Sequence, residues 1–268
     1  MAATRAVPRN VSPLTVQNIV LSPLASSNSS NGNSQSIASE SSEREFVPSS
    51  PLRSYFDALF AAHGPQHWWP GRNRFEIIVG AVLTQNTSWT NVERAIRNLR
   101  DARLLSPQAI RRVRSRRLAQ FLRPSGYFRQ KAKTLKSLVN FLYASHAGSL
   151  SRLFATRTDI LRAQLLGLRG IGPETADSIL LYAGKHPVFV VDAYTRRILE
   201  RHGHADPKLA YDKIRNMFES ALPVDHQLLN EFHALMVHTG KNYCRPSDPR
   251  CSQCSLSRFL PQSTLSAT

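Results

Sequence analysis

Apolar residues recur at helical spacing along most of this chain, and this periodicity constrains the fold more than any other feature. In residues 106–121, Ser106 can cap a helix and Pro107 suits its first position. Apolar residues then follow at roughly helical intervals: Ile110, Val113, Leu118 and Phe121. The same pattern predicts helices over residues 52–62, 74–84, 90–100, 158–166, 173–183, 192–202, 207–221 and 225–239, and around 135–142. Only PVFVVD, residues 187–192, is typical of a strand, so we expect an all-α protein with short connections.

Residues 1–49 have the composition of a disordered tail. The stretch SSNSSNGNSQSIASESSE, residues 26–43, offers almost no side chain that could be buried to offset the entropy of ordering. A transit peptide is the alternative for this Arg- and Ser-containing segment. We therefore expect the folded body to comprise residues 50–268.

The chain carries a formal net charge of +17, and its location is informative. Residues 1–50 contribute nothing, because three arginines there balance three glutamates. A folded body this basic indicates a polyanionic partner, usually nucleic acid, with solubility or an acidic membrane surface as alternatives. No apolar run approaches the roughly 20 residues that span a bilayer, so we expect no membrane partner. The densest basic run, residues 111–117, is either a solvated helix face or a support for phosphates.

The stretch LRGIGPETADSILLYA, residues 168–183, combines a glycine turn with the start of a helix. Gly170 and Gly172 flank an apolar residue, Pro173 suits the first helical position, and Gly184 can stop the helix. Glycines permit positive φ and a close approach of phosphate, and the N–H groups of the next helix can hold an anion. The stretch predicts either a helix–hairpin–helix that grips a nucleic-acid backbone, or a turn without a ligand.

Together with VFVVDAYTRRIL, residues 188–199, this stretch resembles the helix–hairpin–helix, Gly-Pro-Asp (HhH-GPD) superfamily of DNA glycosylases, and within it the endonuclease III family. The similarity extends over residues 52–261. It is supported by GAVLTQNTSWTNVERAI at 80–96, RPSGYFRQKAK at 123–133 and NEFHALMVHTGKNYC at 230–244. The resemblance implies a base excision repair enzyme that acts as a monomer on double-stranded DNA with a damaged base. A cytoplasmic location is expected, because a chain with few cysteines is typical of a reducing compartment.

The resemblance also implies a two-lobed helical fold. Residues 75–190 would form a helical barrel lobe that contains the hairpin at 165–184. The second lobe would combine residues 50–74 with residues 191–268, which include a cysteine loop at 244–260. DNA would lie between the two lobes.

Asp192 ends the apolar run and opens the following helix. In isolation it would be an ordinary N-cap. The resemblance places it at the catalytic Asp of the family, where a carboxylate stabilises positive charge on the sugar and aligns water. A carboxylate next to buried apolar residues would also be partly desolvated, as suits a tuned base.

Glu174 occupies the position at which bifunctional members of the family carry a lysine. That lysine attacks the sugar and forms a Schiff base, which allows strand cleavage. A carboxylate cannot form an imine, so the resemblance implies a catalytic site that uses water and a monofunctional glycosylase. Glu174 is also a favourable acid in the first turn of a helix. Two alternatives remain, namely a bifunctional glycosylase and abasic-site lyase that uses another lysine, and a DNA-binding module without catalysis.

Three further residues are candidates for DNA contact. A base in duplex DNA must leave the stack before an enzyme can act on it. Gln85 and Asn86 match the position from which family members fill the vacated space, although they could simply end the preceding helix. Arg169 lies next to the hairpin glycines and adds a cation there.

Trp68, Trp69 and Phe75 are the candidates for a base pocket. An electron-rich ring stacks well on a base, and better on a cationic alkylated purine. The Trp-Trp-Pro placement resembles the bacterial 3-methyladenine DNA glycosylase branch, although one tryptophan could equally belong to the core. That branch carries a lysine two residues after the His of a Phe-His pair, whereas here Leu235 follows His233 at that spacing. Alkylated purines are therefore the leading hypothesis, and oxidised pyrimidines and mismatched bases stay open.

The three cysteines, Cys244, Cys251 and Cys254, are candidate metal ligands. The resemblance implies a [4Fe–4S] cluster, which needs four thiolates, but Leu260 stands at the position of the fourth cysteine. We favour a degraded cluster site. The alternatives are a three-iron or zinc site, to which His238 could contribute, and three thiols without metal.

Overall fold

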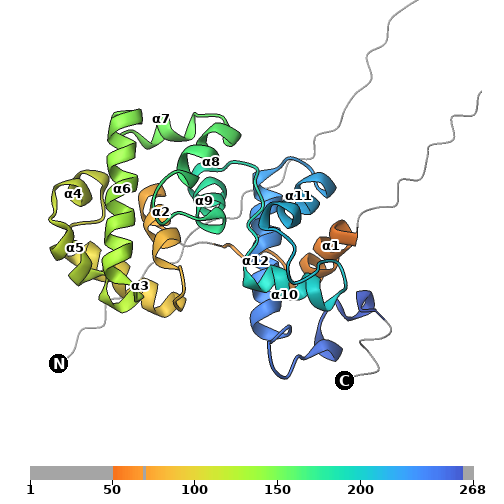
Figure 1. Cartoon of the computed structure of the whole chain (residues 1–268). Coiled ribbons are helices and arrows are strands. Elements are labelled where there is room, and N and C mark those ends of the chain that lie inside the picture. Colours follow the sequence, from red (N-terminus) through yellow and green to blue (C-terminus); the bar gives the residue numbers. More distant parts are fainter. Residues whose placement is uncertain (1–50, 69–70, 262–268) are drawn as a thin grey trace, which may run out of the picture. The chain divides into compact units, whose positions relative to one another are not determined.

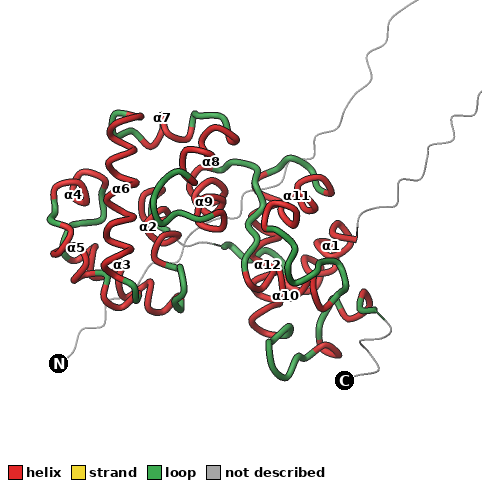
Figure 2. Tube along the Cα trace, viewed as in Figure 1, coloured by secondary structure: helices red, strands yellow, loops and turns green. Residues whose placement is uncertain are grey.

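Helices make up the described part of the chain. The computed structural model describes residues 51–68 and 71–261, and no strand occurs in these ranges, as Figures 1 and 2 show. The α-helices are α1 (Pro51–His63), α2 (Arg74–Leu83), α3 (Trp89–Asp101), α4 (Pro107–Arg112), α5 (Ser115–Phe121), α6 (Phe128–His146), α7 (Leu150–Phe154), α8 (Thr158–Leu166), α9 (Pro173–Ser178), α10 (Ala193–Arg201), α11 (Tyr211–Ala221) and α12 (His226–Asn242). A π-helical segment, η2 (Ile179–Gly184), continues α9, and 3-10 turns are η1 (Arg123–Ser125), η3 (Cys251–Gln253) and η4 (Ser257–Phe259). The expected all-α fold is confirmed. None of the described helices is both long enough and apolar enough to cross a membrane.

Two groups of helices pack within the unit that begins at Val47. Helix α2 contacts α3, α6, α9 and η2, while α6 contacts α4, α5 and α7. Helix α12 contacts α1 and α10, so segments from opposite ends of the described chain lie together (Figure 1). Segment η2 contacts both α2 and α12 and joins the two groups. The residue limits of the two lobes remain a prediction.

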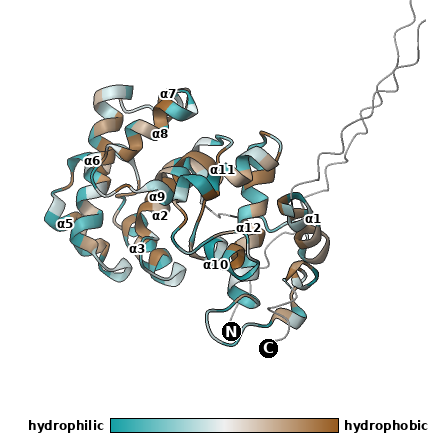
Figure 3. Cartoon of the chain, turned by 45° about the vertical axis from the view of Figure 1, so that its right-hand side comes forward, coloured by the Kyte–Doolittle hydropathy of each residue, from teal (hydrophilic) through white to brown (hydrophobic). Residues whose placement is uncertain are grey.

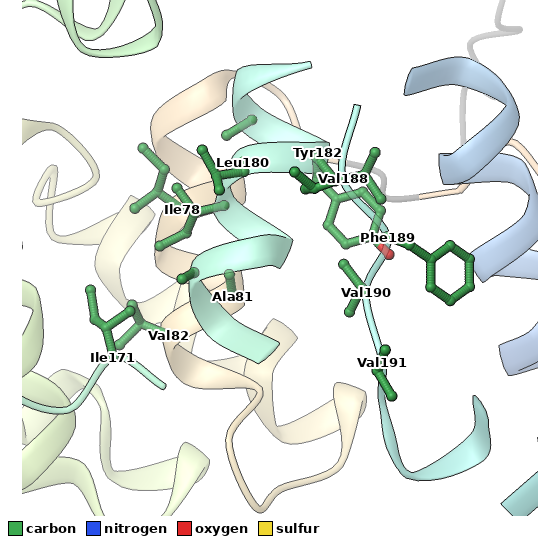
Figure 4. Close-up of a cluster of buried hydrophobic side chains, with 14 of the residues drawn as sticks. Ile78, Ala81, Val82, Ile171, Leu180, Tyr182, Val188, Phe189, Val190 and Val191 are labelled. Atoms are coloured by element: carbon green, nitrogen blue, oxygen red, sulfur yellow. The ribbon is translucent and has the colours of Figure 1, made fainter. Parts of the chain in front are cut away.

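The core around α2 and η2 positions the hairpin. Figure 3 shows apolar residues gathered where helices such as α2 and α9 face their neighbours. Ile78 and Val82 of α2 are fully buried, and Figure 4 shows them beside Leu180 of η2 and Ile171 of the hairpin. Because burial of a Leu or Ile side chain contributes about 1.5–3 kcal/mol, these contacts hold the hairpin firmly against α2.

The strand-like segment before Asp192 is extended but has no partner strand. Its apolar residues, Val188–Val191, are each at most 3% exposed (Figure 4). The amide of Phe189 donates to Glu219 at 2.9 Å, and the amide of Val191 donates to the Tyr211 hydroxyl at 3.2 Å. Because side chains of α11 accept these hydrogen bonds, the buried segment satisfies its backbone without a sheet.

The single helix expected over residues 106–121 is wrong. Ser106 does cap α4, since its side chain accepts from the Ala109 amide at 3.2 Å. The helix then breaks at Val113 and Arg114, whose ψ angles of 140° and 138° are extended. The basic run at 111–117 therefore spans a break and does not form one helix face.

Contrary to expectation, Gly184 is not the left-handed residue that ends the helix. The left-handed residue is Lys185, with φ of +62°. A Cβ at Gly184 would collide with Phe154 and His186, so glycine is needed there for packing.

Candidate functional site

The hairpin between α8 and α9 holds its apolar residue inward and its glycines outward. Ile171 is 5% exposed, whereas Arg169, Gly170 and Gly172 are exposed. Gly170 has φ of +87°, and a Cβ there would overlap with the Thr134 side chain. Both the backbone conformation and the packing therefore require glycine at this position. Gly172 has φ of −94° and open space where a Cβ would stand. The expectation of positive φ is therefore met only at Gly170.

Gln85 ties the end of α2 to this hairpin. Its Nε2 donates to the Gly170 carbonyl at 3.0 Å and to Thr175 Oγ1 at 2.8 Å. Asn86 is exposed and has φ of +51°, which turns the chain away from α2. The structure thus brings Gln85 and the hairpin together and leaves Asn86 next to them.

Asp192 is the N-cap of α10 and still has one carboxylate oxygen free of that role. Its Oδ1 accepts from the Thr195 amide at 2.8 Å. Its Oδ2 lies 3.6 Å from Nε2 of His233, which is buried. The side chain of Asp192 is 14% exposed. Capping and a chemical role are therefore compatible, because they use different oxygens.

Glu174 lies near Asp192 in the first turn of α9. Desolvation, and next the charge of Asp192, raise the pKa of Glu174 to about 7, against the lowering effect of Arg196. A carboxyl group whose pKa is raised by desolvation and by a neighbouring carboxylate is typical of sites that move protons. Glu174 retains exposed surface, so we assign this shift no contribution to folding stability.

Trp68 lies next to Tyr182, whose pKa is raised by burial and also by the charges of Asp192 and Glu174. It is half-buried, and Nζ of Lys241 lies 5.5 Å from its ring centroid. Its indole N–H faces the hydroxyl of Tyr182. Phe75 is 3% exposed and packs in the core, and Trp69 lies outside the described residues.

A family model described as "HhH-GPD superfamily base excision DNA repair protein" matches residues 79–223, which include the hairpin, Glu174 and Asp192. The chain belongs to the HhH-GPD superfamily. As a DNA repair glycosylase of this superfamily, it is an enzyme that acts on N-glycosidic bonds.

Individual relatives and solved structures show which members of the superfamily this HhH-GPD protein resembles. A candidate DNA repair glycosylase of Methanocaldococcus jannaschii is 44% identical over 206 residues, which cover 76% of this chain and 93% of the relative. The structure of H. pylori 3-methyladenine DNA glycosylase bound to 1,N6-ethenoadenine is 31% identical, covers 71% of this chain and 94% of that chain, and has a TM-score of 0.61. An endonuclease III–DNA complex, at 22% identity and a TM-score of 0.69, covers 81% and 96% and shows the shared fold. The resemblance drawn from the sequence is confirmed.

In this HhH-GPD protein, arginines of α10 hold the cysteine loop. Nη1 of Arg201 donates to Cys244 Sγ at 2.9 Å and its Nη2 donates to the Arg245 carbonyl at 3.1 Å. Arg197 donates to the carbonyls of Cys244 at 2.6 Å and Gly240 at 3.0 Å. Burial raises the pKa of the Cys244 thiol, although Arg201 opposes this. Hydrogen bonds from α10 therefore hold the loop against this helix.

The residues of this loop do not fit a four-iron cluster. Leu260 cannot ligate, and it is 9% exposed beside the cysteines. The cavity that they border measures about 10 Å³, close to the space of one water molecule. Among residues 51–68 and 71–261, no three His, Cys, Asp or Glu side chains are placed to hold one metal ion. His238 instead packs against His63, with ring centroids 4.5 Å apart.

Four residues of the site escaped the sequence analysis as functional groups. Tyr182 and His233 are buried beside Asp192. Lys131 is 2% exposed, and its Nζ donates to the carbonyls of Leu83 at 2.9 Å and Ser125 at 2.6 Å, which fixes the end of α2 before Gln85. Tyr127 is 64% exposed at a φ of +42°. The available signals were a histidine and a lysine on apolar helix faces, and an aromatic residue after a glycine.

Proposed function

We propose that this glycosylase is monofunctional and removes a damaged base from double-stranded DNA with water as the nucleophile. The observation that carries the proposal is the pair of carboxylates, Asp192 and Glu174, at the position where a lyase would present a lysine next to an Asp. Desolvation and the charge of Asp192 raise the pKa of Glu174 to about 7. A carboxyl group with this pKa carries a proton part of the time at neutral pH, and it forms no imine.

In this proposal Asp192 faces the sugar with Oδ2. The Thr195 amide holds Oδ1 in place, so the carboxylate keeps its orientation while positive charge develops on the sugar. The same carboxylate aligns the attacking water. Glu174 holds the proton that the departing base takes up, or accepts one from that water.

The exposed hairpin supports a contact with the DNA backbone. Gly170 and Gly172 leave the main chain uncovered, and Arg169 adds an exposed cation beside them. Gln85 lies against the hairpin through two hydrogen bonds, so backbone grip and base eversion would act on the same few nucleotides. Exposed Tyr127 can stack on a base nearby.

An alkylated purine is the substrate that we propose first. The H. pylori relative is a 3-methyladenine glycosylase seen with 1,N6-ethenoadenine, and Trp68 offers a ring for stacking. Lys241 already places a cation 5.5 Å from the centroid of this ring. A cationic base would have to displace Lys241, whereas a neutral adduct such as ethenoadenine would not. We therefore expect neutral adducts to be preferred over cationic 7-methylguanine.

A bifunctional enzyme is the second candidate, because Lys241 lies at the pocket. Its ammonium group could replace the missing lysine of the lyases. Lys241→Met separates the two cases, since only a bifunctional enzyme would lose strand cleavage together with this amine.

Excision from a panel of single-lesion duplexes tests the proposal. The wild-type protein should release base and leave an abasic site that only alkali cuts, and Asp192→Asn should bind lesion DNA without releasing the base. Strand cleavage without alkali, or trapping of a covalent complex by borohydride, would refute the monofunctional reaction. Full excision by Asp192→Asn would refute the assignment of the carboxylate.

We further propose that the cysteine loop acts as a degraded cluster site that does not carry a full [4Fe–4S] cluster. This is supported by Leu260 and by the arginine contacts to Cys244. Iron and sulfide analysis with a visible spectrum tests it.

A further inference from the structure

A line of side chains connects Trp68 with Asp192 through the interior. The Tyr182 hydroxyl is hydrogen-bonded to Nδ1 of His233, and Nε2 of the same ring lies 3.6 Å from Asp192 Oδ2. At its other end the Tyr182 hydroxyl faces the indole N–H of Trp68, which opposes the rise in the pKa of Tyr182 that burial causes. Tyr182 and His233 are 7% and 4% exposed, so both lie away from bulk water.

The groups at the two ends determine where the hydrogens of this line lie. The Asp192 carboxylate only accepts, and the Trp68 indole only donates. Burial lowers the pKa of His233, although Asp192 opposes this, so the ring is neutral and carries one proton. The carboxylate favours that proton on Nε2, which leaves Nδ1 to accept from Tyr182. All donors in the line therefore point from the pocket toward Asp192.

We propose that Tyr182 and His233 are positioning residues that aim Asp192 at the sugar when a base rests on Trp68. This inference rests on the proposed glycosylase function. Thr195 restrains Oδ1, and the Nε2–H of His233 restrains Oδ2. The present separation of 3.6 Å is about 0.6 Å longer than a hydrogen bond. A small shift on base binding would close it, as happens in many catalytic sites.

Single-turnover excision and DNA affinity, measured separately, test this role. His233→Leu and Tyr182→Phe should each slow excision tenfold or more, with less than a twofold change in Kd. His233→Gln should recover part of the rate, because its amide can donate to Asp192. Tyr182→Phe should add nothing to His233→Leu, since Tyr182 acts through His233.

His186→Leu is the matched control. His186 is also buried, at 8% exposed, but its partner is Thr158 at 2.9 Å and not Asp192. It should lower the melting temperature without slowing excision. Equal slowing by His186→Leu, a wild-type rate in Tyr182→Phe, or multiplying effects in the double variant would overturn the inference. Full excision by Asp192→Asn would instead refute the assignment of the Asp192 carboxylate, on which this inference rests.

A separate observation carries a second inference, which concerns a basic groove between α5 and α6. Its volume is about 340 Å³, and no carboxylate borders it. The groove is lined by Ser115, Arg116, Ala119, Gln120, Arg123, Phe128, Arg129 and Lys133. The four cations are exposed and form no ion pair with any residue that the structure describes. Arg123 and Arg129 lie 6.0 and 5.7 Å from the ring centroid of Phe128.

Helix α6 links this groove to the hairpin. Arg129 and Lys133 lie on the groove, while Lys131 reaches the end of α2 and Thr134 lies against Gly170. From residue 129 to residue 134 a helix rises about 7.5 Å, which is roughly two phosphate steps along one DNA strand. One duplex is therefore long enough to reach both the hairpin and the groove.

We infer that the basic groove binds the backbone phosphates of duplex DNA that flanks the lesion. Unpaired cations without neighbouring carboxylates favour a polyanion, and phosphate contacts fix register without reading sequence. The groove would lengthen the DNA footprint and contribute affinity rather than chemistry.

A triple variant, Arg116→Gln, Arg129→Gln and Lys133→Gln, tests the groove on undamaged duplexes, so the outcome does not depend on excision. Loss of three phosphate contacts should lower the slope of log K against log salt by about 2–3. Affinity for a long undamaged duplex should fall at least tenfold, whereas an undamaged duplex too short to span the hairpin and the groove together should bind as before.

The matched control removes three exposed cations elsewhere, through Arg152→Gln, Lys208→Gln and Lys213→Gln. It changes net charge equally and should leave the slope nearly unaltered. An equal loss in this control, or an equal loss on short and long duplexes, would show that general charge and not the groove is responsible.

Discussion

The two hairpin glycines allow a sharp test, because the structure separates their roles. At Gly170, φ is +87° and a Cβ would overlap with Thr134 Oγ1 and lie 3.3 Å from Thr134 Cβ. At Gly172, φ is −94° and no atom lies within 4 Å of a Cβ. Gly170→Ala should therefore disturb the fold, whereas Gly172→Ala should disturb only what approaches the hairpin from outside.

The cost at Gly170 can be worked out from these two features. A left-handed conformation costs an alanine roughly 1–2 kcal/mol, and forced overlap in a packed region costs about 1–3 kcal/mol. The sum is about 2–5 kcal/mol, or a decrease in melting temperature of about 4–20 °C for a domain of this size. Gly172→Ala should stay within about 0.5 kcal/mol of the wild type.

Thermal melting and DNA binding by fluorescence anisotropy distinguish the outcomes. Both variants should bind duplex DNA more weakly, and only Gly170→Ala should melt early. Adding Thr134→Ala should recover the overlap part of the Gly170→Ala loss and leave the conformational part. Wild-type binding by Gly172→Ala would refute the idea that phosphate approaches the main chain there, and wild-type melting of Gly170→Ala would refute the packing argument.

Three further predictions follow from the site. Burial lowers the pKa of Lys131 from 10.5 to about 8, so the unfolded chain binds the proton of this side chain more tightly than the folded chain does. The free energy of unfolding of the wild type should therefore rise relative to that of Lys131→Met between about pH 8 and pH 10.5. Urea titrations across this pH range would show the rise. Glu174→Lys should create borohydride-trappable lyase activity that the wild type lacks, and an absence of trapping with intact DNA binding would contradict the placement of this residue at the sugar. Chelators should leave the melting temperature of the wild type unchanged, whereas Arg201→Met should lower the melting temperature, because hydrogen bonds hold the cysteine loop. A large effect of chelators would show that a metal holds the loop.

Helix positions were largely predictable, because burial of an apolar face depends on local periodicity. The exceptions have identifiable causes. The break at Val113 leaves both flanking helices amphipathic, so the apolar spacing continues across it. The extended segment before Asp192 is typical of a strand, but Glu219 and Tyr211 of α11 accept its amide hydrogen bonds. No local sequence pattern indicates hydrogen-bond partners that lie so far along the chain.

The sequence by itself determined that this protein is helical, basic and built around a glycine hairpin followed by a carboxylate. These properties follow from spacing, charge count and the backbone freedom of glycine, all of which are local. Only the tertiary structure decided that Gln85 lies on Gly170 and that Tyr182 and His233 lie behind Asp192. It also decided that arginines of α10 donate hydrogen bonds to Cys244. The reason is physical: hydrogen bonds and desolvation depend on which residues, far apart in sequence, share one low-dielectric neighbourhood, and that is known only once the helices have packed.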